Sequence, residues 1–362
     1  MGGSDAEAFF ASTHGGLSCT ECHDGDETAS DMTAAHAGLI PRPSEGGAAC
    51  VTCHADEVAN LKTSLHGTLR GERVLLARRY GVDDFEDLPA SVREGYGADC
   101  ASCHTSCGDC HVSRPPTVGG GLVNSHLFAP PDMTNNCTAC HGSRLGEEYK
   151  GEREGYAADV HFVPGAKRCT DCHGATELHG DGTEYDHRLE VASMPACEDC
   201  HGGTANANTY HSVHWGELQC QVCHSQDYKS CNSCHAGEGL GEPSYLTFKI
   251  GRNPVPDIRP YEYVTLRHVP VSPSTFADWG AATLANFDTE PTWKYSAPHN
   301  IQRWTDRTEV GEGESCGASC HNSPDGVEGV FLRQADLDAM SAEEKAANID
   351  LIVPNGSPTQ WD

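Results

Sequence analysis

The sequence is poor in basic residues and contains no long apolar run. Lys and Arg together number 24 against 53 Asp and Glu in 362 residues, which gives a formal net charge of −29. A charge this negative argues against binding to nucleic acids and to anionic membrane surfaces. Because no stretch of about 18 apolar residues occurs, we expect no transmembrane helix. Residues 1–5 also lack the basic region and apolar core of a signal peptide, so we interpret the numbered chain as a mature form.

Apolar residues are scarce as well. They make up 37% of the chain, below the roughly 45–50% of ordinary globular proteins, whereas glycine (39) and proline (20) are frequent. The chain is long enough for two ordinary domains, but its own side chains would fill an apolar core poorly. We therefore expect short helices, many loops and a core completed by something other than side chains.

Cysteine, in contrast, is abundant and follows one pattern. All 20 cysteines fall into ten pairs, and each pair is followed directly by a histidine. Two residues separate the cysteines of nine pairs and three separate those of the tenth, and two complete units share residues 100–111. The pairs are Cys19/Cys22, Cys50/Cys53, Cys100/Cys103, Cys107/Cys110, Cys137/Cys140, Cys169/Cys172, Cys197/Cys200, Cys220/Cys223, Cys231/Cys234 and Cys316/Cys320. The histidines that follow them are His23, His54, His104, His111, His141, His173, His201, His224, His235 and His321.

The pattern Cys-x-x-Cys-His is the signature of covalent haem c attachment. Two intervening residues place both sulfurs on one side of a helical turn, where they can bond to one porphyrin while the histidine ligates its iron. A disulfide scaffold or a set of zinc ribbons would not require a histidine after every pair. We therefore predict ten covalently attached haems c. For Cys316/Cys320 the alternative is a disulfide beside an unrelated histidine.

The remaining histidines match the number of second iron ligands. Eleven of the 21 histidines lie outside the motifs, and ten six-coordinate irons need ten further ligands. This match predicts bis-histidine ligation, since methionine, the alternative ligand, occurs only five times. His179 is set aside because it lies in a Gly/Asp-rich turn close behind a motif, with His187 nearby. The predicted distal ligands are His14, His36, His66, His126, His161, His187, His211, His214, His268 and His299.

The chain divides by its cysteine content. Residues 1–240 form a haem-dense region with nine motifs, and residues 241–362 form an aromatic and proline-rich region with one. Alternating residues within 241–270 predict a small hairpin. The apolar spacing of 74–80 and the polar pattern of 334–349 predict helices. The predicted fold is mostly irregular, with short α-helices wrapped around a haem core and little β-structure.

The expected ligation favours electron transfer over catalysis. Iron with two histidine ligands has no open site, so it passes electrons without binding substrate. No lysine replaces a motif histidine, and no cysteine is left over as a nucleophile. The alternative is a multihaem oxidoreductase in which one iron keeps an open position. An acidic cluster at Asp24, Asp26 and Glu27 is a candidate calcium site, although it lacks an EF-hand pattern.

The run of motifs over residues 14–321 resembles the multihaem cytochromes c of metal-respiring bacteria. The likeness is carried by motifs such as Cys220-Gln-Val-Cys-His and Cys231-Asn-Ser-Cys-His, and by residues 291–304 before the last motif. The resemblance implies an extracellular or cell-surface electron carrier, such as a subunit of cytochrome filaments (nanowires), with a soluble periplasmic carrier as the alternative. Octahaem enzymes acting on hydroxylamine, nitrite or tetrathionate share the dense motifs but have fewer of them.

We also expect the chain to polymerise. Haem motifs lie near both ends of the sequence, and aromatic residues of the C-terminal region are candidates for an interface core. These aromatics are Trp279, Trp293, Tyr295 and Trp304. His14 and His36 are the candidates for a ligand given to a neighbouring subunit. The expected partners are therefore copies of the chain, other cytochromes, and oxide or metal acceptors. Because haem c is attached outside the cytoplasm, we expect an exported protein.

Overall fold

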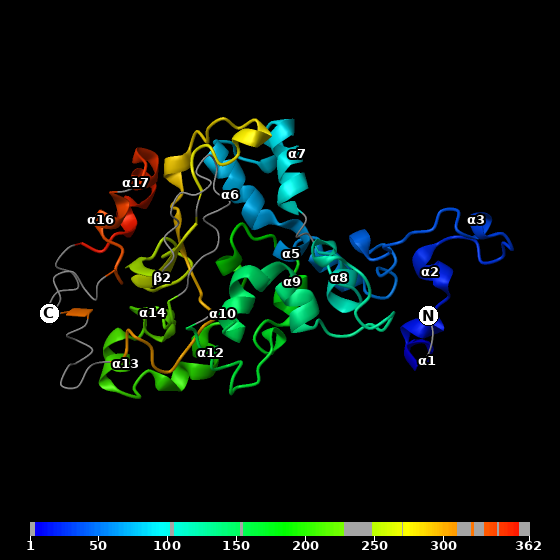
Figure 1. The fold of residues 1–362 in the computed structure, drawn as a ribbon, viewed down its shortest axis with the longest axis horizontal. Coiled ribbons are helices and arrows are strands. Elements are labelled where there is room, and N and C mark those ends of the chain that lie inside the picture. The colour runs from blue at the N-terminus through cyan, green and yellow to red at the C-terminus, as the bar shows by residue number, and fades with distance from the viewer. Residues whose placement is uncertain are drawn as a thin grey trace. The chain divides into compact units, whose positions relative to one another are not determined.

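The computed structural model describes residues 4–101, 105–152, 155–227, 248–269, 271–309, 320–321, 329–338 and 340–354. Short helices joined by loops make up most of these residues (Figure 1). They form two compact units, each built from three separate stretches of sequence. The first unit comprises Met1–Gly71, Ala98–Gly142 and Arg168–Met194, and the second comprises Glu72–Gly97, Ser143–Lys167 and Pro195–Asp362. The second unit thus takes residues from both sides of residue 240.

The first unit is a set of short helices. They are α1 (Ser4–Phe10), α2 (Cys19–His23), α3 (Met32–Ala35), α4 (Ala55–Leu61), α5 (Leu65–Thr68), α8 (Cys107–His111), α9 (Thr138–His141) and α11 (Ala175–His179). Single π or 3₁₀ turns lie between them, including η6 (Met133–Cys137) and η8 (Cys169–Asp171). Helix α11 contacts both α4 and α5.

Acidic residues close the first turn of several motif helices. Helices α2 and α8 begin at the first cysteine of a motif and end at its histidine. In α8, the Asp109 carboxylate accepts hydrogen bonds from the backbone N–H and the hydroxyl of Ser106, directly before the helix. The equivalent carboxylates of Glu21, Asp171 and Asp199 also accept a backbone N–H. A carboxylate here satisfies an otherwise unpaired N–H and complements the helix dipole, so the motif itself starts its helical turn.

The second unit combines short helices with a small sheet. Its helices include most of α6 (Arg70–Tyr80) and α7 (Ala90–Asp99), with α10 (Glu147–Lys150), α12 (Cys197–His201), α13 (Thr209–His214), α14 (Gln221–His224), α16 (Gln334–Leu337) and α17 (Ala342–Asn348). Helix α6 confirms the helix predicted over 74–80. The single helix predicted over 334–349 is instead two, because the Ser341 side chain accepts the backbone N–H of Glu344 and starts α17 anew.

Strands β1 (Lys249–Arg252), β2 (Tyr263–His268) and β3 (Trp293–Tyr295) form an antiparallel sheet in that order. In this sheet Gly251 pairs with Val264, and Leu266 pairs with Tyr295. Strands β1 and β2 confirm the predicted hairpin, although residues 241–247 lie outside the described residues. The fold is thus mostly helices and loops with little β-structure, as the composition predicts.

The sheet fixes the start of one haem motif. Helix α14 lies against β2 (Figure 1), and its Val222 packs in a buried cluster with Ile250 of β1. Gln219, directly before the motif, is 1% exposed. Its side chain accepts the N–H of Thr265 and donates to the carbonyl of Ser296, each at 2.8 Å. These bonds tie the motif beginning at Cys220 to the sheet.

The aromatic residues of the C-terminal region mostly serve the packing of this unit. Trp293 and Tyr295 lie in β3 and are 0% and 8% exposed. Trp279 stacks on Phe276 with ring centres 4.5 Å apart. Trp304 alone among the four predicted interface aromatics is well exposed, at 60%. The expectation that all four supply an interface core is therefore corrected, because β3 carries two of them into the unit's own core.

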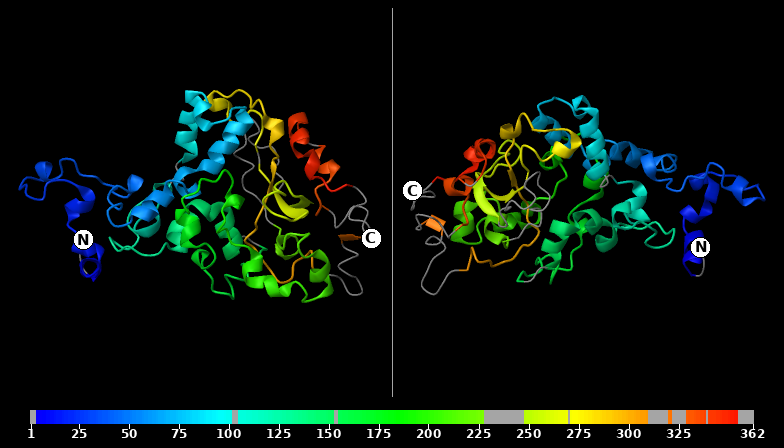
Figure 2. Two further views of the ribbon diagram at one scale, coloured as in Figure 1. Left: turned by 180° about the vertical axis from the view of Figure 1, so that it is seen from behind. Right: turned by 45° about the horizontal axis from the view of Figure 1, so that its top comes forward.

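Helix α17 completes this part of the second unit. It contacts the 3₁₀ turn η13 (Phe287–Thr289), beside the sheet (Figure 2). The side chain of Asn348 on α17 accepts the N–H groups of Thr292 and Trp293. Among the described helices, none is long and apolar enough to cross a membrane.

Candidate haem-binding sites

Most of the predicted attachment and ligand residues lie in the described part of the chain. Those outside it are Cys103, His104, Cys231, Cys234, His235 and Cys316. The described cysteines carry thiols and form no disulfide with one another. Several motif histidines end a short helix, as in α2, α8, α9, α12 and α14. What each histidine ring faces therefore tests whether the chain fits a six-coordinate iron.

The second cysteines of three motifs differ from the expected helical placement. Cys53 and Cys172 are exposed and lie in turns, outside any helix. Cys223 lies in α14, but this helix begins only after the first cysteine of its motif. The expectation that every motif forms its own short helix is therefore corrected at Cys53, Cys172 and Cys223. The sequence predicts thioethers at these three sulfurs, which are thiols in the structure, and their attachment to haem stays a prediction.

The reason for this difference is a tighter turn that still keeps the motif geometry. The backbone N–H of each of these second cysteines donates to the carbonyl of the first cysteine, three residues earlier, at 3.2 Å, as in a 3₁₀ turn. The N–H of the following histidine donates to the same carbonyl at 2.9 to 3.0 Å, as in an α-helix. The three motifs thus make a single helical turn that holds both sulfurs and the histidine together. The bonds start from the carbonyls of Cys50, Cys169 and Cys220.

Seven motif histidines face a histidine from outside the motifs. In every pair the ring centres lie 6.0 to 6.3 Å apart. The pairs are His23 with His126, His54 with His14, His111 with His179, His141 with His66, His201 with His161, His224 with His211, and His321 with His214. Each pair lies within one of the two units.

This separation fits one iron between the two rings. A metal–imidazole bond is about 2 Å long and a ring centre lies about 1 Å behind its nitrogen, so rings on opposite sides of one metal stand about 6 Å apart. Direct stacking brings rings closer, as between His14 and Phe128 at 4.2 Å. The rings of His14 and His54 are within 20° of parallel but 6.2 Å apart. The residues present therefore fit bis-histidine haem iron.

Burial keeps several of these histidines neutral. It lowers the pKa of His66, His179 and His224 below the ordinary value, and it has the same effect on the pKa of His126. Neutral imidazole is the form that ligates a metal, because the binding nitrogen needs its lone pair. These four side chains are thus in the protonation state that ligation requires.

Backbone carbonyls orient other rings. Nδ1 of His23 lies 2.8 Å from the carbonyl oxygen of Ile40, and Nδ1 of His111 lies 2.9 Å from that of Ala129. The same contact is made by His211, His214 and His224. A carbonyl oxygen only accepts hydrogen bonds, so Nδ1 carries the proton and Nε2 keeps the lone pair for a metal.

Two histidines hold a carboxylate in place of a carbonyl. Nδ1 of His161 lies 2.8 Å from Oδ1 of Asp159. Nδ1 of His173, a motif histidine, lies 2.8 and 2.9 Å from the two carboxylate oxygens of Glu177. The hydrogen bond to Glu177 raises the pKa of His173. Both carboxylates are shielded from solvent, with side chains 2% and 8% exposed.

The structure places His179, rather than His187, opposite a motif histidine. His179 is the last residue of α11, and Gly180, with φ of 91°, ends the helix directly after it. The ring then faces His111 at 6.0 Å. His187 lies at the start of the turn η9 (Arg188–Glu190), where its Nδ1 accepts the N–H of Leu189. Sequence reasoning missed His179 because its neighbours indicated a turn.

Three other predicted ligands have different surroundings. Nε2 of His268 lies 2.7 Å from Glu344 Oε1, so the usual ligating nitrogen of this buried histidine is already used. Nδ1 of His299 lies 2.9 Å from the carbonyl oxygen of Ala297. His36 follows α3, is exposed, and faces no other histidine within the described residues.

First cysteines of different motifs touch one another. Hydrogen bonds join the thiols of Cys50 and Cys107, of Cys137 and Cys169, and of Cys197 and Cys220. Each contact lies within one unit and joins, respectively, the second motif to the fourth, the fifth to the sixth and the seventh to the eighth. Since each sulfur bonds the edge of its own porphyrin when haem is attached, these contacts bring neighbouring haem edges together.

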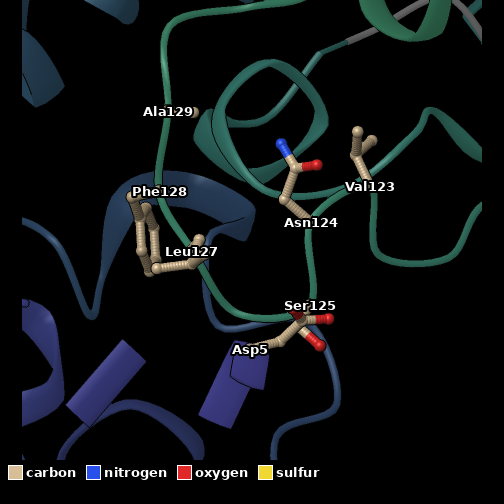
Figure 3. A pocket seen from close by; sticks show the side chains of 7 residues that line it. All are labelled: Asp5, Val123, Asn124, Ser125, Leu127, Phe128 and Ala129. Atoms are coloured by element: carbon tan, nitrogen blue, oxygen red, sulfur yellow. The ribbon is translucent and has the colours of Figure 1, made fainter. Parts of the chain in front are cut away.

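A cavity lies beside the ligands of the first two motifs. It has a volume of about 400 Å³ and is lined by Asp5 of α1 and by residues of the loop 123–129 (Figure 3). The same loop carries His126, which faces the first motif histidine, and Phe128, which stacks on His14. The loop therefore serves two predicted haems and leaves open space beside them.

The acidic cluster predicted as a calcium site gains no support. Among the described residues, no group of three or more His, Cys, Asp or Glu is arranged to hold a bare metal ion. The Asp26 carboxylate instead accepts the N–H and the hydroxyl of Thr28.

Comparisons with known proteins find a distant likeness. No family model matches the chain, and no curated protein matches it. Among solved structures, the chain is similar to the crystal structure of an octaheme cytochrome c from Shewanella oneidensis, with 18% sequence identity and a TM-score of 0.32. The likeness covers 56% of this chain and 55% of that protein, so the chain matches about half of its structural relative. A likeness this distant carries no argument about function, and the histidine pairs stand on their own.

Proposed function

We propose that the chain is a multihaem c-type cytochrome that transfers electrons. The observation that carries this proposal is the set of seven facing histidine pairs, each joining a motif histidine to one outside the motifs. A disulfide scaffold or a set of zinc ribbons gives no reason for such pairing. Haem c, when bound, supplies reversible one-electron chemistry at its iron. The chain's own residues attach it, ligate it from both sides and hold neighbouring motifs in contact.

The thiol contacts support a haem order in the first unit that differs from the order of the motifs. Contacts between first cysteines join the second motif to the fourth and the fifth to the sixth. Electrostatic interactions of Cys22 with Cys50, and of Cys110 with Cys140, join the first to the second and the fourth to the fifth. We infer the order first, second, fourth, fifth, sixth for these haems.

The pairing also favours electron transfer over catalysis. A histidine on each side of the iron closes both axial positions, and a substrate then has no place to bind. A multihaem oxidoreductase needs one iron with a single histidine. The seven facing pairs supply the second ligand for seven motifs, which supports a carrier of electrons without a catalytic residue.

We further propose that the protein works outside the cytoplasm as a subunit of a homopolymer. It would pass electrons to other cytochromes or to oxide and metal acceptors. The support lies in His36, an exposed ligand-type side chain between Met32 (73% exposed) and Leu39 (44% exposed). An exposed apolar surface of this kind is suited to contact with another protein. The alternative is a soluble periplasmic carrier.

Intact mass tests the proposal directly. Mass spectrometry of the denatured protein should give the polypeptide mass plus ten haems. A value of nine, with Cys316 and Cys320 joined in a disulfide, would remove the tenth site. A protein without covalent haem would end the proposal altogether.

Carbon monoxide tests the assignment to electron transfer. The reduced native protein should bind none, because every iron is closed on both sides. Stoichiometric binding at one iron without denaturant would instead favour the oxidoreductase.

A further inference from the structure

Asp159 holds an imidazole in a way that the carbonyl-bound histidines do not share. Its Oδ1 accepts both the backbone N–H and the Nδ1–H of His161, each at 2.8 Å. Its Oδ2 accepts the N–H of Ile301 at 2.8 Å. The side chain is 2% exposed, so solvent screens its charge poorly. The ring that it holds faces the motif histidine His201 at 6.0 Å.

A carboxylate on the far side of a ligand histidine changes the metal. It raises the basicity of the imidazole, and the added negative charge favours the oxidised, more positive iron. A neutral backbone carbonyl fixes the ring orientation but adds no charge. The difference between these acceptors should therefore appear as a difference in reduction potential.

We propose that Asp159, acting through His161, makes the haem of Cys197, Cys200 and His201 one of the lowest-potential haems of the chain. Glu177 acts in the same way through His173 on the haem of the sixth motif. Both are positioning residues, since neither touches the iron or the porphyrin in the argument. The inference rests on the proposed function, and it names which haems are hardest to reduce.

The opposite end of the scale belongs to the first motif. Its distal partner His126 has a buried Nδ1 that finds no hydrogen-bond partner within the described residues. An imidazole without an acceptor is a weaker base, and it stabilises oxidised iron less. We therefore expect this haem to accept electrons more readily than the haem that Asp159 controls.

The variant Asp159→Asn tests the assignment in the full-length, haem-loaded protein. Asparagine keeps an oxygen for His161 and removes the charge. A spectroelectrochemical titration should lose one electron's worth of signal at low potential and regain it higher. We expect at least a tenfold change in the ratio of the two oxidation states at fixed potential, which is about 59 mV for a one-electron couple.

Asp199→Asn is the matched control. Asp199 lies in α12, the helix that carries the proximal ligand of the same haem, and it is exposed where Asp159 is buried. It removes the same charge without touching an imidazole, so its titration should overlay that of the wild type. Equal shifts in the two variants would overturn the inference, as would a fully loaded Asp159→Asn protein with an unchanged titration.

Glu177→Gln keeps the inference testable if Asp159→Asn fails to fold or load. Glu177 lies in the other unit, and its variant should raise the potential of a different single haem. Asp171→Asn, which alters an exposed carboxylate in the same motif, is its control. Haem content is measured first in each case. Absence of haem from the wild type contradicts the proposed function, whereas a loaded protein with unshifted potentials contradicts only the role of the carboxylates.

Discussion

A single helix end decides which histidine of the first unit serves the fourth motif. His179 and His187 are both near the sixth motif in sequence, and local spacing favours His187. In the structure α11 carries His179 to its last position, and the ring faces His111 at 6.0 Å. Burial lowers the pKa of His179 and keeps the imidazole neutral. The chemistry of the residue thus depends on where its helix stops.

The variant His179→Ala should open one iron. With His111 as its only protein ligand, that iron becomes high-spin when oxidised and binds one carbon monoxide per molecule when reduced. Electron paramagnetic resonance and carbon monoxide titration measure both effects. His36→Ala is the control, since His36 is exposed and faces no other histidine among the described residues. A His179→Ala protein that stays entirely low-spin would contradict the pairing.

The sequence alone predicts the attachment residues well and the ligand pairing poorly. Attachment requires residues within one helical turn, and a motif such as Cys107–His111 contains its whole geometry. Pairing depends on tertiary structure. His126 precedes the fifth motif, yet it faces His23 of the first. No local pattern encodes that choice, because a loop and a distant helix have to meet.

Elements show the same division between local and distant causes. The hairpin of β1 and β2 follows from alternating residues, and helix α6 follows from apolar spacing. Strand β3 is only three residues long, too short for alternation to reveal it. It forms because β2 offers an open edge, and its Trp293 then fills the core with 0% exposure.

The substitution Trp293→Ala should strongly destabilise the second unit. Removing a fully buried indole leaves a cavity and costs about 3–5 kcal/mol of the free energy of unfolding. Trp304→Ala is the matched control, since that side chain is 60% exposed and its loss should cost within about 0.5 kcal/mol. Guanidinium unfolding of the haem-loaded protein, followed by far-ultraviolet circular dichroism, measures both. Equal midpoints for the two variants would contradict the assignment of Trp293 to the core.

At the scale of the whole molecule, the two units do not follow the change in cysteine content. That change lies near residue 240, but residues on both sides of it belong to the second unit. The sheet explains this finding, because Gln219 and Val222 of a haem motif are bonded to or packed on its strands. Composition records which residues occur, whereas unit membership depends on which residues touch.

Self-association is the prediction that belongs to this scale. Sedimentation of the native protein at high concentration in physiological salt should give species larger than the monomer. Salt supports assembly, because it screens the repulsion of a chain with net charge −29 beyond about 8–10 Å. His36→Ala should weaken the association if this exposed ligand joins the contact. A single species of monomer mass would favour the soluble carrier.

The histidine pairs also order the maturation of the protein in time. A chain is made from its N-terminus, so a pair is complete only when its later histidine has emerged. His14, His66, His161, His211 and His214 precede the motif histidines that they face, so those sites are complete as soon as the motif appears. His23 must wait for His126, and His111 must wait for His179. These two irons are therefore the ones that a newly made chain leaves open to foreign ligands.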